Sequence, residues 1–169
     1  MPSQVYAQVT AAPLIWGSGS GQDYAISLDG LSAAAIRQGV KGDLGKNTGG
    51  HVSGRFAVVL EWDATSSPTS GGTIDLYWAG SPSSTAATDN PGETTGADAA
   101  YSITDGEKQL ELVGKLTVYA STNTQRTIVG VLEPKFRYGM PVVDNNASTA
   151  AASADLGRVY LYPIPDESL

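Results

Sequence analysis

The chain has 169 residues with 17 acidic and 10 basic side chains, which give a formal net charge of −7 at pH 7. A phosphate backbone is bound by clustered lysines and arginines. The basic residues here are scattered, so nucleic-acid binding is excluded as a leading function. The sequence contains no cysteine, which excludes disulfides and thiolate metal sites.

Composition and length favour a single all-β domain. Charged residues make up 16% of the chain, below the roughly 25% usual for soluble domains. The length is sufficient for one domain with a substantial core. We expect no signal peptide, because the first residues lack its basic and apolar regions. We also expect no membrane span, because no run approaches the required ~18 apolar residues.

The first 22 residues are expected to form an N-terminal arm and a hinge, and residues 23–169 a β-sandwich domain. Residues 4–10 alternate between polar and apolar side chains, and residues 17–21 (GSGSG) are a flexible hinge by composition. Two interpretations stay open for this region. It is either an ordinary loop between strands or an arm that reaches a neighbouring subunit.

Strand-like alternation begins after this hinge. Tyr24, Ile26 and Leu28 alternate with polar residues and precede an Asp-Gly turn pair. Residues 31–40 contain an alanine run that suits a helix. Their alternation and the nearby glycines favour an extended strand.

The strongest alternation occurs in residues 55–62 (RFAVVLEW) and 73–79 (TIDLYWA), which a Ser/Pro/Gly-rich stretch separates. The large apolar side chains fall on one face of each segment: Phe56, Val58, Leu60 and Trp62 on the first, and Ile74, Leu76 and Trp78 on the second. This pattern predicts neighbouring antiparallel strands with one buried face, and it places both tryptophans in the core.

The second half of the chain mixes loops and short strands. Residues 80–100 are polar and have no periodicity, and a stretch of this length is usually functional or disordered. Residues 107–116 are compatible with a strand or a helical turn. Further strands are expected at residues 101–103, 116–120, 126–132, 141–143 and 158–162. Prolines 134, 141, 163 and 165 are expected at strand ends or edges, since proline cannot donate to a central ladder.

Eight or more short strands with long crossing loops predict the fold class. We expect a jelly-roll or Greek-key β-sandwich with long loops, in which one short helical turn can occur. No repeat of 20–50 residues is visible, which weighs against propellers and solenoids.

Candidate catalytic residues are few. His51 is the single histidine and lies in a glycine-flanked loop, and no G-x-S-x-G motif accompanies it, so we interpret it as a surface residue. Glu61, Asp63 and Asp75 could supply the two carboxylates of a glycoside hydrolase. By alternation, Glu61 and Asp75 point away from the large apolar residues, which favours solvent-facing or inter-subunit charges. We therefore expect no catalytic residue.

Two Asx-rich segments offer the oxygen ligands that calcium accepts. They are residues 144–146 (DNN) and residues 89–90 (DN). Neither has the spacing of a calcium loop, and Asx residues are common in turns. We expect neither a metal nor a cofactor. Residues 146–148 (NAS) match the glycosylation triplet, which matters only in a eukaryotic secretory pathway.

Four tyrosines, Tyr77, Tyr119, Tyr160 and Tyr162, are expected partly on outward positions. Exposed tyrosines could stack on sugars or anchor a protein interface, where aromatic residues are enriched. The interface is favoured, because no tight aromatic cluster with Asp or Asn partners stands out.

Four stretches of the chain resemble small virion structural proteins of tailed bacteriophages. They are residues 72–81 (GTIDLYWAGS), 112–116 (LVGKL), 137–148 (RYGMPVVDNNAS) and 161–167 (LYPIPDE). The resemblance spans residues 25–167. It lies in the general character of these segments and in their order along the chain. It implies a capsid decoration, or cement, protein, which is a β-sandwich or jelly-roll unit on the outer capsid surface, often a trimer. It brings no catalytic residues.

The resemblance thus predicts a non-enzymatic virion protein that binds the major capsid protein and itself, with a homotrimer favoured and no nucleic-acid or membrane partner. Its location would be the outer capsid surface, after synthesis in the cytoplasm of the bacterial host. The alternative is a tail-associated carbohydrate-binding module that recognises the host. An exposed cluster of aromatic and Asp or Asn residues in loops 80–100 and 144–149 would distinguish it. A hydrolase using Glu61 and Asp75 is a third hypothesis.

Overall fold

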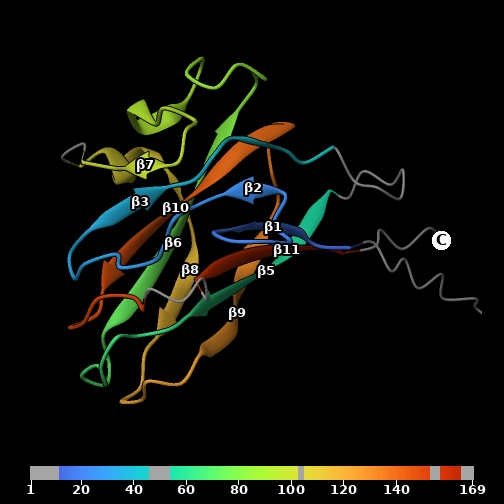
Figure 1. Ribbon diagram of the computed structural model, residues 1–169. Coiled ribbons are helices and arrows are strands. Elements are labelled where there is room, and N and C mark those ends of the chain that lie inside the picture. Colours follow the sequence, from blue (N-terminus) through green and yellow to red (C-terminus); the bar gives the residue numbers. More distant parts are fainter. Residues whose placement is uncertain (1–11, 46–53, 103–104, 153–156, 165–169) are drawn as a thin grey trace, which may run out of the picture.

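A computed structural model describes residues 12–45, 54–102, 105–152 and 157–164. His51, Pro165 and the alternating residues 4–10 lie outside these ranges. The chain forms two β-sheets packed face to face (Figure 1). Sheet A has the order β2-β1-β11-β5-β9 and contains β1 (Leu14–Gly17), β2 (Tyr24–Ala25), β5 (Arg55–Trp62), β9 (Gln125–Leu132) and β11 (Arg158–Ile164).

Sheet B has the order β7-β3-β10-β6-β8, and β4 also pairs with β10. Its strands are β3 (Ile36–Gln38), β4 (Gly42–Asp43), β6 (Thr73–Ser81), β7 (Ala99–Ala100), β8 (Glu111–Thr117) and β10 (Tyr138–Asn146). Two short 3₁₀ helices, η1 (Pro91–Glu93) and η2 (Gly106–Gln109), lie between β6 and β8. In the described part of the chain, no helix is long and apolar enough to cross a membrane.

The strand order is that of a jelly roll. Without the two-residue strands, sheet A reads β1-β11-β5-β9 and sheet B reads β3-β10-β6-β8. The first and last strands are therefore neighbours, and the chain crosses repeatedly between the sheets, as in two Greek keys folded together. Paired strands are antiparallel except β1 and β2. The expected all-β jelly-roll or Greek-key sandwich is confirmed.

The prediction that residues 55–62 and 73–79 form neighbouring strands is wrong. β5 pairs with β11 and β9, whereas β6 pairs with β10 and β8, so the two strands belong to opposite sheets. The turn-rich residues between them carry the chain from one sheet to the other. Alternation reports which face of a strand is buried, but distant segments of the chain decide its neighbours.

The predicted buried faces are confirmed. Every apolar residue assigned to the inner faces of β5 and β6 is at most 3% exposed, and all of them belong to one core between the sheets. Trp62 and Trp78 lie in this core, and Trp16 from β1 joins them at 0% exposure. Trp16 packs edge-on against Trp78 with the ring centroids 5.6 Å apart. The tryptophans therefore tie the two sheets together.

β1 lies within the region expected as an arm and hinge, residues 1–22. It pairs with β11 over its whole length, and the indole nitrogen of Trp16 donates to the carbonyl of Val40 at 2.8 Å. The described part of this region, from residue 12, is thus integrated into the sandwich through β1. Its glycine-rich residues connect β1 to β2 within sheet A.

The edge strands β8 and β9 meet and close one side of the sandwich, and we call this line the seam. Each strand carries a bulge there, at Val113 in β8 and at Val129 in β9, where the ladder with the neighbouring strand skips one residue. Bulges bend a strand and increase its twist, so both edges turn toward each other. A Cβ on Gly114 would lie 1.9 Å from the carbonyl oxygen of Val129, and one on Gly130 would lie 2.3 Å from that of Val113. Only glycine permits this contact of backbone with backbone.

Residues 82–102 and 105–110 form an excursion between β6 and β8 that covers part of the outer face of sheet B; it rises at the top of Figure 1. Tyr101 and Leu110 of the excursion pack on Ala79, Met140 and Val142 of the sheet in a second apolar cluster. The sequence leaves open whether the polar residues 80–100 are ordered. In the structure they have a defined conformation and pack on sheet B.

Two charged side chains, one buried and one partly buried, anchor the excursion. The ammonium of Lys41 donates to the Ser81 hydroxyl and to the carbonyls of Ser83, Thr85 and Thr88 at 2.7–3.1 Å. Burial lowers the pKa of Lys41, and the charge of nearby Asp89 opposes that shift.

The second anchor is Asp98, which accepts hydrogen bonds from the amide and hydroxyl of Ser27 and from Arg37. Burial would raise the pKa of Asp98, but these hydrogen bonds outweigh it and hold the pKa below its usual value.

Several predicted strand limits differ from the structure. Residues 31–40 form a strand only over Ile36–Gln38, and β8 ends at Thr117 rather than continuing through residues 118–120. Pro141, expected at a strand end or edge, lies inside β10, which pairs on both sides. The ladder of β10 with β3 and β4 is interrupted at this point, and the Pro141 carbonyl accepts the amide of Gly39 at 2.9 Å. The missing proline N–H therefore faces a gap in the ladder.

Candidate interaction surface

Exposed apolar side chains gather in one part of the sequence. Among the described residues, the large apolar side chains that are exposed all lie between residues 112 and 136: Leu112 (48%), Tyr119 (55%), Ile128 (66%), Val131 (53%) and Phe136 (45%). This segment comprises β8, β9 and their flanking turns. Scattered exposed apolar residues are ordinary, but a contiguous group marks an interaction surface.

The seam places three of these residues together. Because Val113 contacts Gly130, the preceding Leu112 and the following Val131 lie opposite each other across the seam. In the sheets, Leu112 is paired with Tyr77 and Val131 with Ala57, while Ile128 is paired with Val59 on the outer face of sheet A. We call Leu112, Ile128 and Val131, with the adjoining Lys115 and Arg126, the seam surface.

The two cations of the seam surface are held by acids that lie beneath them. Lys115 forms an ion pair with Asp75, and their side chains are 49% and 5% exposed. The hydrogen bond and charge of Asp75 raise the pKa of Lys115. Arg126 pairs with Glu61 at 3.4 Å, with side-chain exposures of 46% and 13%. The surface therefore presents apolar groups and two ion-paired cations to solvent.

Beside the seam, tyrosines fix the position of Arg126. Its guanidinium lies 4.5 Å from the ring centroid of Tyr160 and donates a 2.8 Å hydrogen bond to the hydroxyl of Tyr162. The two tyrosine rings stack with centroids 6.0 Å apart. Tyr162 is half-buried and Tyr160 is only 7% exposed, so Tyr160 supports the surface rather than forming its contact area.

A shallow groove of about 310 Å³ lies at the end of the seam surface. Lys115, Tyr119, Arg126 and Ile128 are among its lining residues. Gln125 also lines it, but its amide is engaged with the backbone of Tyr119 through two 3.0 Å hydrogen bonds. Through this groove, the exposed ring of Tyr119 adjoins the seam surface.

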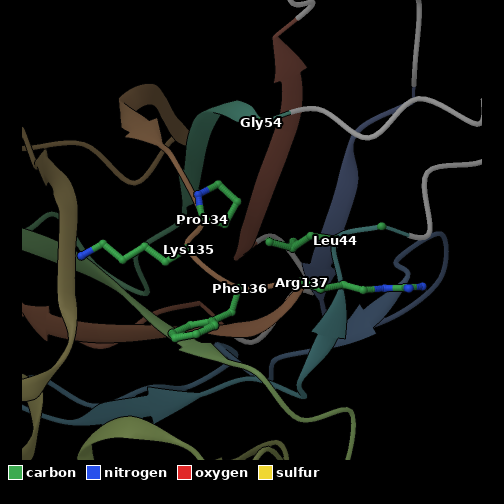
Figure 2. A pocket seen from close by; sticks show the side chains of 7 residues that line it. Leu44, Gly54, Pro134, Lys135, Phe136 and Arg137 are labelled. Carbon is green, nitrogen blue, oxygen red and sulfur yellow. The ribbon is translucent and has the colours of Figure 1, made fainter.

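A second concavity of about 380 Å³ lies between the β9–β10 connection and residues 44–45 (Figure 2). Phe136 and Arg137 line it, and Arg137 forms a bidentate pair with Asp43 at 2.8 Å. Gly45 and Gly54, which flank residues 46–53, are also part of its wall. Because those residues lie outside the described ranges, we assign no site to this concavity.

The structure places the carboxylates considered for glycoside hydrolysis on different sheets. Glu61 lies on the outer face of sheet A and is paired with Arg126, and Asp75 lies on the outer face of sheet B and is paired with Lys115. Of the two roles expected for Asp75, a solvent-facing or an inter-subunit charge, the solvent-facing one is wrong, since the residue is 3% exposed beneath Lys115 and beside Asp144. Asp63 accepts the backbone amide of Ala64 at 3.1 Å in the turn after β5.

The Asx segments have structural roles. The side-chain amide of Asn145 donates to the carbonyls of Leu31, Ser32 and Thr149, and that of Asn90 donates to those of Ala86 and Thr94. Within the ranges that the structure describes, no three His, Cys, Asp or Glu side chains converge to hold a metal ion.

Tyr119, Tyr160 and Tyr162 are predicted from the sequence as outward residues, whereas the aliphatic residues of the seam surface are not. Their outward positions follow from the two bulges, which shift the alternation within β8 and β9.

Comparison of the chain with protein-family models, curated proteins and solved structures finds no match.

Proposed function

We propose that this chain is a non-enzymatic virion structural protein that decorates a bacteriophage capsid and stabilises the head. The observation that carries the proposal is the seam surface, which gives the sandwich exposed apolar side chains and ion-paired cations for protein contacts. Jelly rolls occur in viral capsid and lectin domains, so the fold is compatible with this role by analogy only.

The physical demands on a decoration protein agree with this geometry. Many copies share the load on a shell, so modest contacts become strong in aggregate. The long edges of both sheets seal each other along β8 and β9, and the opposite edges are the two-residue strands β2 and β7. Short or covered edges suppress uncontrolled sheet association when copies are crowded together.

Cryo-electron microscopy of virions from the source of this sequence tests the proposal. We expect density for the jelly roll on the outer capsid surface. Purified protein should also bind to shells that lack it. Absence of the protein from the particle would overturn the proposal, and density at the tail tip would favour the alternative below.

The alternative is a tail-associated carbohydrate-binding module. Its support is Tyr119, an exposed ring beside a groove that Lys115 and Arg126 also line. Loops 80–100 and 144–149 contain no aromatic residue, so the cluster expected for this function does not occur there. Binding to host polysaccharide that Tyr119→Ala abolishes would support the alternative.

A further inference from the structure

Three charged residues lie in one row across the outer face of sheet B. Asp75 of β6 is directly opposite Lys115 of β8 on one side and directly opposite Asp144 of β10 on the other. The Lys115 ammonium donates a hydrogen bond to the Asp75 carboxylate, with Nζ and Oδ2 2.5 Å apart. The row therefore brings together an amine nitrogen, a carboxyl carbon and a second carboxyl group.

The Lys115 nitrogen lies close to the Asp75 carboxyl carbon. This carbon is one C–O bond beyond Oδ2, so Nζ and Cγ are at most about 3.7 Å apart. Reacting atoms held about 3–3.5 Å apart react as if present at effective molarities of about 10⁵–10⁸ M. Proximity of this kind favours condensation to an amide, which is unfavourable between separate molecules in water.

Burial distinguishes this pair from the exposed pair Lys108–Asp105. Both pairs have an N–O distance of 2.5 Å, but the side chains of Lys108 and Asp105 are 69% and 65% exposed. The Asp75 side chain is 5% exposed, and its Oδ1 atom is buried without a hydrogen-bond partner. Exclusion of water from Asp75 favours neutral species over charged ones and protects an amide from hydrolysis.

We propose that Lys115 and Asp75 condense into an intramolecular isopeptide bond, an amide that joins β6 and β8 covalently. The ammonium first passes a proton along its hydrogen bond to Oδ2, which gives a neutral amine and a carboxylic acid. Nζ then attacks Cγ, and the Cγ–Oδ2 bond breaks as Oδ2 takes a second proton from Nζ and leaves as water. One N–C bond forms and one C–O bond breaks, with no oxidant or reductant. This bond does not depend on the proposed function.

Asp144 has a supporting role at the buried Oδ1 atom of Asp75. Negative charge develops on this oxygen when Nζ attacks, and a hydrogen-bond donor beside it stabilises that charge. Burial and the charges of Asp75 and Glu107 raise the pKa of Asp144, whereas Asn146 and Lys115 oppose the shift. The Asp144 carboxyl therefore keeps its proton to a higher pH than an ordinary aspartate and can act as the donor.

The bond ties an edge strand to the interior of its sheet. β8 is the last strand of sheet B and β6 is its neighbour. The two linked residues are 40 positions apart, and the excursion lies between them in the chain. A covalent link across a loop of this length restricts the unfolded chain, so the cross-linked protein should melt at a higher temperature than a protein without the bond.

The intact mass of the purified protein tests the proposal. We expect a mass about 18 Da below that of the sequence, because the cross-link releases one water. Trypsin cleaves after lysine and arginine, and amide formation blocks cleavage at Lys115. The digest should therefore contain residues 56–108 joined to residues 109–126. Tandem mass spectra of this joined peptide locate the bond.

Four variants identify the residues that react. Lys115→Arg keeps a positive charge beside Asp75 but forms no amide, so it should have its full sequence mass and a lower melting temperature. Lys108→Arg, the same substitution at the exposed pair, is the matched control and should retain the mass deficit. Asp144→Asn keeps a hydrogen-bond donor and should cross-link, whereas Asp144→Val should cross-link about a hundredfold more slowly.

Other outcomes overturn the proposal. A full sequence mass in the unsubstituted protein after prolonged incubation at neutral pH would show that the bond does not form. A deficit that persists in Lys115→Arg would mean that water is lost elsewhere in the chain, for example by cyclisation of an aspartate. Cross-linking of Asp144→Val at the rate of the unsubstituted protein would exclude Asp144 as the donor. None of these measurements depends on where the protein is located.

Discussion

Asp144 illustrates how a single carboxylate is affected by its neighbours. It lies on the outer face of sheet B directly opposite Asp75 in the adjacent strand. Burial, and then the negative charges of Asp75 and Glu107, raise the pKa of Asp144, although a hydrogen bond from Asn146 opposes the shift. The charged form is therefore less stable in the folded protein than in the unfolded chain.

Replacing Asp144 by Asn should stabilise the protein at neutral pH. A raised pKa contributes stability that is complete below the pKa of the unfolded carboxyl and is lost as the pH rises through the folded value. The variant cannot ionise and escapes this loss, while its amide oxygen still accepts the bond from Asn146. We expect equal stabilities near pH 3 and a gain of about 0.5 kcal/mol at pH 7, reduced from the full electrostatic effect because the side chain is partly solvated.

Urea denaturation at several pH values measures this difference. Glu111→Gln removes an exposed charge from β8 of the same sheet and is the matched control for the loss of one carboxylate. A difference between the Asp144→Asn and unsubstituted proteins that is constant with pH would contradict the explanation, since it would not follow the ionisation of Asp144.

At the scale of elements, the seam depends on the close approach of β8 and β9. Gly114→Ala should destabilise the fold, because the added methyl group would meet the Val129 carbonyl carbon at 2.7 Å and its oxygen at 1.9 Å. Backbone atoms cannot move aside as a flexible side chain can. Overpacking of this kind typically costs about 1–3 kcal/mol, and we expect a value toward the upper end.

Thermal denaturation of Gly114→Ala and Gly80→Ala compares the two positions. Gly80 also lies in a strand, but an added methyl group there would meet the half-exposed ring of Phe136 at 3.3 Å and the ring of Trp78 at an ordinary contact distance of 3.8 Å. Gly80→Ala should therefore have a much smaller effect on the melting temperature. Equal effects would indicate that the loss comes from alanine in a strand and not from the contact at the seam.

The sequence predicts the elements of this fold better than their arrangement. Strands β5, β6 and β11 are found from local alternation, because one buried face leaves a period of two in the sequence. The partners of β5 and β6 are not found, since pairing depends on segments far along the chain. The bulges at Val113 and Val129 also lack a local signal, so the outward positions of Leu112 and Val131 escape prediction.

Burial of polar residues is predicted poorly for the same reason. Alternation places Asp75 correctly on the outer face of its strand, but burial there depends on what covers that face. Here Lys115 from β8 and Asp144 from β10 surround it. The ordered structure of residues 80–100 likewise depends on Lys41, which lies about forty residues earlier in the chain. Neither contact follows from local sequence.

At the scale of the whole molecule, one core joins both sheets. Leu60 of β5 and Leu76 of β6 belong to opposite sheets and to the same buried cluster, and they are 0% and 1% exposed. Trp16, Trp62 and Trp78 lie in that cluster as well. Neither sheet can lose its partner without exposing this apolar surface to water, so the sandwich should unfold as one cooperative unit.

Leu60→Ala and Leu76→Ala test this cooperativity from the two sides of the core. Each should lower the free energy of unfolding by roughly 2–5 kcal/mol, because each leaves a cavity in a closely packed interior. Tryptophan emission and far-ultraviolet circular dichroism should give coincident urea transitions in both variants. The matched control is Leu112→Ala, where the same atoms are removed from a side chain that is 48% exposed and the loss should be much smaller. A two-step transition in either core variant would mean that the sheets unfold separately, and that the shared core does not couple them.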